Sequence, residues 1–91
     1  MLTLCKTALR ISTSAFDTEI KMLINDCLLE LYGLGLVDDA TMDPVDEQIQ
    51  GAVIFYCKWK FGDNPDAERW EHIYNDKISR LLLMSGYGLE E

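Results

Sequence analysis

The sequence predicts an all-α fold: a compact antiparallel helical bundle of one short and three long helices. Three observations lead to this fold class. Apolar residues recur at helical spacing, start and stop signals for helices frame each stretch, and alternation of period two never persists. With 91 residues, of which 48% are apolar and 26% charged, the chain is expected to form a single helical domain over residues 1–91.

The first predicted helix is short and spans about Thr3 to Arg10. A second helix is expected from about Ala15 to Tyr32, because Ser14 stands three residues before Asp17 in a pattern that resembles a capping box. The apolar stripe of this helix follows the i, i+3, i+4, i+7 template. It consists of Phe16, Ile20, Leu23, Ile24, Cys27, Leu28 and Leu31.

Gly33 and Gly35 end the second helix, since glycine adopts a left-handed cap at little cost. The third helix is predicted from about Pro44 to Phe61, with Asp43 as N-cap and proline at the first helical position. Its stripe consists of Val45, Ile49, Ala52, Val53, Tyr56 and Trp59.

Gly62 stops the third helix, and Asn64 followed by proline repeats the same start signal. The fourth helix is therefore expected from about Pro65 to Met84, and Ser85 to Gly88 are expected to close the fold. Its stripe consists of Ala67, Trp70, Ile73, Tyr74, Ile78 and Leu81.

The net charge is −8, which opposes broad non-specific contact with phosphates. Three cysteines, Cys5, Cys27 and Cys57, are far apart and form no CxxC pair, so buried reduced thiols are expected rather than a zinc site. No signal peptide is visible, and no run approaches the ~20 apolar residues of a membrane span. A soluble intracellular protein is the expectation, with no membrane association.

No pattern for catalysis, a cofactor or a metal emerges. His72 lies on the polar side of its helix, and neither a nucleophile–base arrangement nor a glycine-rich phosphate loop is present. Five carboxylates fall between Asp38 and Glu47, but their spacing does not match a calcium loop, and helix capping accounts for several of them. We expect no enzyme activity, no cofactor and no metal.

The run FYCKWKF, residues 55–61, alternates aromatic rings with lysines, a combination that single-stranded nucleic-acid platforms use. On a helical wheel, Tyr56, Trp59 and Lys60 point toward the main stripe or its edge. Lys58 and Phe61 point away from it. The rings are therefore expected to divide between the core and a second surface, which favours the end of a core helix over a stacking shelf.

Four apolar residues lie off the main stripes. Met22 and Leu29 are seven residues apart on the second helix, and Ile54 and Phe61 are seven apart on the third. Apolar pairs on the polar sides of consecutive helices favour contact with a partner. These four residues are the candidate subunit interface, and a wide core with a few exposed side chains is the alternative.

The order of these features resembles the head–tail connector proteins of tailed bacteriophages, which are often described as DNA-packaging proteins. The resemblance covers nearly the whole chain and lies in LTL…KTALRIS, FDTEIKMLINDCLLEL, DEQIQGAVIFYCKWKFGDNPDAERW and YNDKISRLLLMSGYG. Its motifs are patterned positions rather than catalytic signatures. Only Asp17 and Glu19 remain of the clustered acids that usually open the second helix of the family.

The resemblance implies a structural subunit that assembles as a homo-oligomeric ring. Such a ring docks beneath the portal protein, extends the channel for double-stranded DNA without binding it specifically, and receives the next neck or tail protein. The subunit would occupy the bacterial host cytoplasm during assembly and the virion neck afterwards. Two other functions stay open: a cytosolic helical module that regulates a partner protein, and a nucleic-acid-binding protein.

Overall fold

The computed structural model describes residues 1–84, and within them the chain forms four helices and no strand. They are α1 (Leu2–Leu9), α2 (Asp17–Gly33), α3 (Glu47–Lys60) and α4 (Ala67–Leu83). The predicted all-α class with one short and three long helices is confirmed. The expected closing segment, Ser85 to Gly88, lies outside the described residues.

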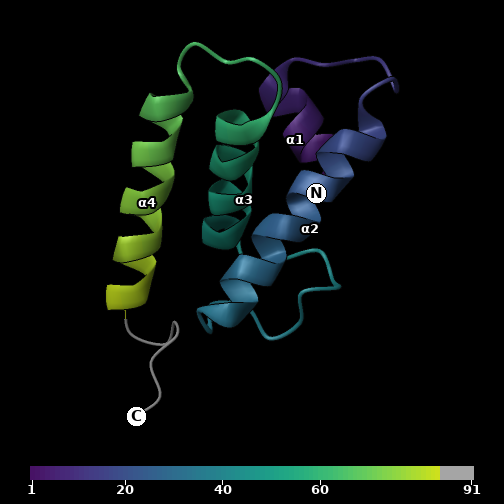
Figure 1. Cartoon of the computed structure of the whole chain (residues 1–91). Coiled ribbons are helices and arrows are strands. Elements are labelled where there is room, and N and C mark those ends of the chain that lie inside the picture. Colours follow the sequence, from purple (N-terminus) through teal and green to yellow (C-terminus); the bar gives the residue numbers. More distant parts are fainter. Residues whose placement is uncertain (85–91) are drawn as a thin grey trace.

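Helix α3 is the centre of the fold. It packs against each of the other three helices, whereas α4 packs on α3 alone among the helix pairs of the described chain. Figure 1 shows α2, α3 and α4 side by side with consecutive helices antiparallel, and α1 near the ends where α2 begins and α3 ends. This arrangement leaves the outer side of α2 and the connection between α2 and α3 open to partners.

The core contains mainly aliphatic side chains, two tyrosines and all three cysteines. Its members are Cys5, Ile20, Ile24, Cys27, Leu28, Leu31, Leu36, Ile49, Ala52, Val53, Tyr56, Cys57, Tyr74, Ile78 and Leu81. The predicted stripes are therefore confirmed in their central parts. They fail elsewhere: Phe16 is 43% exposed and Val45 is 91% exposed. The first half of the predicted α4 stripe is only half-buried and lies outside the core cluster, namely Ala67, Trp70 and Ile73.

Val45 is exposed because α3 begins at Glu47, three residues later than predicted. Asp46 is the N-cap, and its side chain accepts a hydrogen bond from the backbone N–H of Gln48 at 2.8 Å. The predicted cap, Asp43, instead forms an ion pair with the N-terminal amine. Asp43 and Asp46 are both suitable N-cap residues. The ion pair with the N-terminal amine engages the Asp43 carboxylate, so Asp46 caps the helix.

The capping box predicted for the second helix is also wrong. The N-cap of α2 is Phe16, with no capping hydrogen bond from a side chain. Ser14 contributes only its backbone carbonyl, which accepts from the N–H of Asp17. The Asp17 carboxylate pairs with Lys6 of α1 at 2.8 Å, so it stabilises the packing of two helices rather than the helix end.

Helix α4 begins at Ala67, two residues later than predicted, with Asp66 rather than Asn64 as its N-cap. The turn before it does have the predicted glycine and asparagine. Gly62 has φ 64°, and the side chain of Asn64 accepts from the N–H of Asp66 at 2.8 Å. Asn64 also donates from its amide to the Lys58 carbonyl at 2.7 Å, which ties the end of α3 to the start of α4. At the other connection, Gly35 has φ 79° just after α2, as expected for a glycine cap.

Candidate assembly surfaces

The three cysteines of the core are fully buried. Cys5, Cys27 and Cys57 are free thiols at 0% exposure, which confirms the expectation of buried reduced cysteines. Burial raises the pKa of Cys27 to about 12, with the Sγ of this residue 3.9 Å from the Oη of Tyr74. The hydrogen bond to Cys5, together with burial, raises the pKa of Cys57. Cys27 and Cys57 therefore fill space rather than act as thiolate nucleophiles at neutral pH. The hydrogen bond with Cys57 lowers the pKa of Cys5, but this thiol is also fully buried.

The described residues offer no cluster of His, Cys, Asp or Glu with the geometry of a metal site, and His72 is exposed on α4. Within the same part of the chain, no helix has the length and hydropathy to cross a membrane. The candidate functional residues of the described chain are therefore those of its surface.

Three of the four rings of the FYCKWKF segment, those of Phe55, Tyr56 and Trp59, pack against rings of α4. Tyr56, Trp59 and Tyr74 form one cluster, with centroid distances of 5.3–5.8 Å. The Nζ of Lys60 lies 4.2 Å from the centroid of Trp59. Since Tyr56 and Tyr74 are buried, the cluster is not an open row of rings on which bases could stack.

A second ring pair lies beside it. Phe55 stacks on Trp70 at 5.9 Å with an interplanar angle of 24°. The Nζ of Lys58 lies 4.6 Å and the Cζ of Arg69 5.8 Å from the centroid of Trp70. The wheel placed Lys58 away from the core stripe, and it is half-buried beside α4 because Trp70 offers it a ring face.

The candidate interface residues on α2 are exposed. Met22 is 62% exposed and Leu29 is 61% exposed, and Tyr32 continues the apolar surface at 55%. Positions 22, 29 and 32 lie on neighbouring parts of one helix face. An ordered helix thus presents three large side chains that contribute little to its own core.

The candidate interface residues on α3 have a different environment. Ile54 and Phe61 are partly buried and pack against the core cluster. The ring of Phe61 meets that of Phe16 edge to face, with centroids 5.5 Å apart. The structure therefore does not bring the four candidate residues together as one equally exposed set. The α3 pair packs against the rest of the core, and the wheel of one helix could not reveal this.

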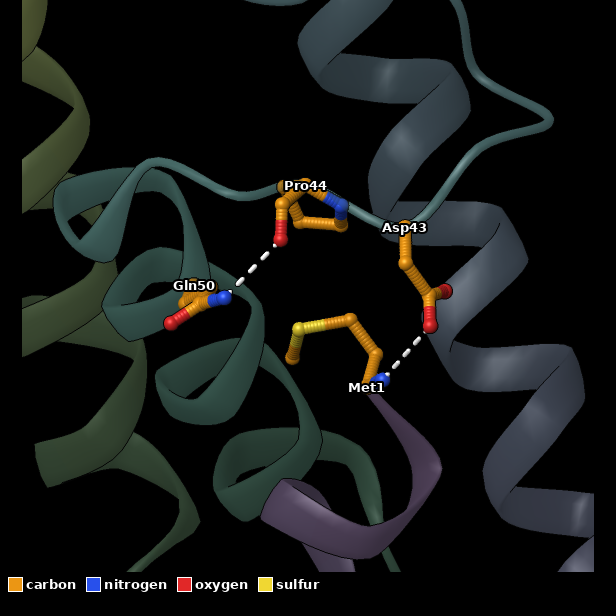
Figure 2. A network of polar contacts seen from close by, with 4 residues as sticks. All are labelled: Met1, Asp43, Pro44 and Gln50. Atoms are coloured by element: carbon orange, nitrogen blue, oxygen red, sulfur yellow. Dashed lines mark hydrogen bonds and ion pairs between the residues drawn. The ribbon is translucent and has the colours of Figure 1, made fainter.

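The connection from α2 to α3 is held by polar contacts at several points (Figure 2). The N-terminal amine of Met1 pairs with the Asp43 carboxylate at 2.8 Å, and the Gln50 amide donates to the Pro44 carbonyl at 2.9 Å. Asp39 accepts hydrogen bonds from the N–H and the hydroxyl of Thr41, at 2.8 and 2.6 Å. These contacts fix the backbone of a long surface loop.

This fixed loop presents apolar side chains to solvent. Met42 is 64% exposed and Val45 is 91% exposed, at the rim of a hollow of about 420 Å³. The hollow is lined by Leu36, Val37 and Ile49 together with four aspartates, Asp38, Asp39, Asp43 and Asp46. Sequence reasoning missed this surface because it assigned Val45 to a helix. The available signal in the sequence was the presence of two large apolar residues, Met42 and Val45, inside an acidic segment.

Together these features define a class of protein: a small helical protein that presents apolar and charged side chains on an ordered backbone, the type of surface that binds partner proteins. A family model described as "Phage connector protein" matches residues 1–88, so the chain belongs to the phage connector family. This family is structural and serves as a connector between phage head and tail, in association with other phage proteins. No curated protein and no solved structure matches the chain.

Proposed function

We propose that this connector forms a homo-oligomeric ring that docks under the portal protein, extends the DNA channel and receives the next neck or tail protein. The observation that carries the proposal is the exposed apolar face of α2 in a chain that belongs to the connector family. A ring subunit needs different patches on its two sides, since each copy contacts its neighbours head to tail. It would act in the host cytoplasm during assembly and in the virion neck afterwards.

Met22 and Leu29 are the residues we assign to a partner contact, with Ile54 and Phe61 of α3 as half-buried supports. Leu29→Asp is the variant to test first, because Leu29 is 61% exposed and its replacement leaves the core intact. Phe61→Asp is less suitable, because it also removes the edge-to-face contact with Phe16 and would lower stability.

The test is mass photometry and negative-stain imaging of the protein, alone and mixed with the portal protein of the same phage. We expect rings for the wild type and weakened assembly for Leu29→Asp. Thr18→Asp provides a control at another exposed position of α2. A wild type that stays monomeric under both conditions would overturn the proposal.

Passage of double-stranded DNA without specific binding is the second part of the proposed function. A net charge of −8 disfavours adhesion to phosphates, although high charge also serves solubility. In a DNA titration at low salt we expect no saturable binding. Tight binding that weakens steeply with added salt would instead support a nucleic-acid-binding protein.

A further inference from the structure

The loop between α2 and α3 ends in a dense group of negative charges. The acidic loop, residues 38–47, contains five carboxylates and no Lys or Arg. Asp38 and Glu47 are exposed, and within residues 1–84 neither forms an ion pair. Met42 and Val45 project from the same segment, so the loop combines charge with exposed apolar surface on a fixed backbone.

The complementary surface lies on α3 and α4. The tryptophan strip consists of Phe55, Lys58, Arg69 and Trp70, in which both cations lie over the Trp70 ring and the ring stacks on Phe55. Within the described chain, neither Lys58 nor Arg69 forms an ion pair with a carboxylate. In a chain of net charge −8, two such cations on one aromatic surface are a local exception.

The two surfaces cannot meet within one copy. Glu47 is the first residue of α3 and Lys58 lies near its last turn. At 1.5 Å per residue the helix separates these positions by about 16 Å, well beyond the ~4 Å of an ion pair. Figure 1 shows the α2–α3 loop and the α3–α4 turn at opposite ends of α3. A contact between them therefore joins different molecules.

We propose that the acidic loop of one copy binds the tryptophan strip of the next copy, in a head-to-tail contact. This inference rests on the proposed ring and assigns it a pair of surfaces. Met42 and Val45 pack on the ring pair of Phe55 and Trp70, while Asp38 and Glu47 pair with the strip cations at the rim.

The occupant is a second copy because this chain itself carries both halves of the contact. The arrangement has an apolar centre with aromatic residues and a charged rim, which is the usual anatomy of a protein interface. It is also heterologous, with different patches on the two molecules, as ring closure requires. The polar contacts that fix the loop reduce the entropy lost on binding, because the loop is already ordered.

A charge swap tests the proposal with two variants. The basic-loop variant carries Asp38→Lys and Glu47→Lys, and the reversed-strip variant carries Lys58→Glu and Arg69→Glu. Each variant alone opposes like charges across the contact, so assembly should require at least about tenfold more protein, a change of about 1.4 kcal/mol. An equimolar mixture restores opposite charges, and the two variants should then assemble together as alternating copies.

The control carries Lys21→Glu and Arg80→Glu, which changes net charge by the same amount as the reversed strip at other exposed positions. Mass photometry measures assembly, and circular dichroism verifies that each variant is folded. If a reversal prevents folding, Lys58→Gln with Arg69→Gln replaces the reversed strip and should weaken assembly without repulsion.

The outcomes separate this contact from the proposed function. Restored assembly in the mixture supports the contact. Rings that form equally well from the wild type and from each folded variant alone would place the contact elsewhere and overturn the inference, while the ring itself stands. A mixture that fails to assemble, although the control and the wild type do, also overturns the inference. A wild type that is monomeric even with the portal protein overturns both.

Discussion

The buried thiol of Cys27 predicts how the stability of the fold depends on alkaline pH. Burial raises the pKa of this thiol from an ordinary 9.0 to about 12. As pH rises above 9, the unfolded chain releases the Cys27 proton while the folded chain keeps it. The stabilising contribution is therefore complete below pH 9 and is lost progressively up to about pH 12.

The magnitude follows from the two pKa values. Between pH 8 and pH 10, a shift from 9.0 to about 12 lowers the free energy of unfolding by about 1.3 kcal/mol. Cys57, whose pKa is also raised, adds a loss in the same direction. The variant Cys27→Ala should be less stable than the wild type at pH 8 but lose about 1.3 kcal/mol less between the two pH values.

Urea unfolding at pH 7, 8, 9 and 10, under a reducing agent that stays active over this range, measures the effect. Val53→Ala is the matched control, because Val53 is also at 0% exposure and its truncation removes apolar volume without removing a titrating group. Its curve of stability against pH should run parallel to that of the wild type. If the Cys27→Ala curve runs parallel as well, the buried thiol is not the titrating group and the reasoning fails.

Three further predictions concern caps and the loop. Arg10 ends α1 with φ 61°, a conformation that glycine adopts at lower cost, so Arg10→Gly should stabilise the protein by about 1 kcal/mol. Gly62→Ala, at φ 64°, should destabilise it by a similar amount. Thermal unfolding followed by circular dichroism compares the two variants with the wild type. Asp43→Asn removes a largely exposed ion pair worth about 0.2–1 kcal/mol. It should lower Tm by about 1–6 °C relative to Asp38→Asn, which has the same charge change. Equal Tm values for the two variants at low salt would contradict a stabilising role for the ion pair. Asp46→Ala removes the N-cap of α3 and should cost about 1 kcal/mol in urea unfolding, and an unchanged urea midpoint would show that the cap contributes nothing.

Much of the fold could be predicted from periodicity alone. The stripe of α2 identified Ile20, Ile24 and Leu31 correctly, because a long amphipathic helix must bury that face. The glycines at 35 and 62 marked the chain reversals, since both positions adopt positive φ. These features depend on residues close together in the sequence, so they can be predicted from the sequence alone.

The predictions that failed concern residues whose positions depend on contacts between segments distant in the sequence. Asp43 carries a good capping signal, but its carboxylate pairs with an amine 42 residues away. Lys58 turns toward a tryptophan on the next helix. Phe61 appeared to face solvent on its own helix and instead meets Phe16, the N-cap of α2. A helical wheel describes one helix and contains no information on the neighbouring segments that cover its other sides. It therefore separated exposed from buried positions poorly on α3.

The complete burial of the three cysteines has a practical consequence for following the assembly of this protein. A thiol-reactive dye attaches to accessible thiolates, and the native thiols are all at 0% exposure. A single cysteine placed at an exposed position outside the proposed contact, such as 18 or 79, would therefore be labelled selectively in the wild-type background. Donor and acceptor copies prepared in this way would report subunit contact by energy transfer, with every core cysteine left in place.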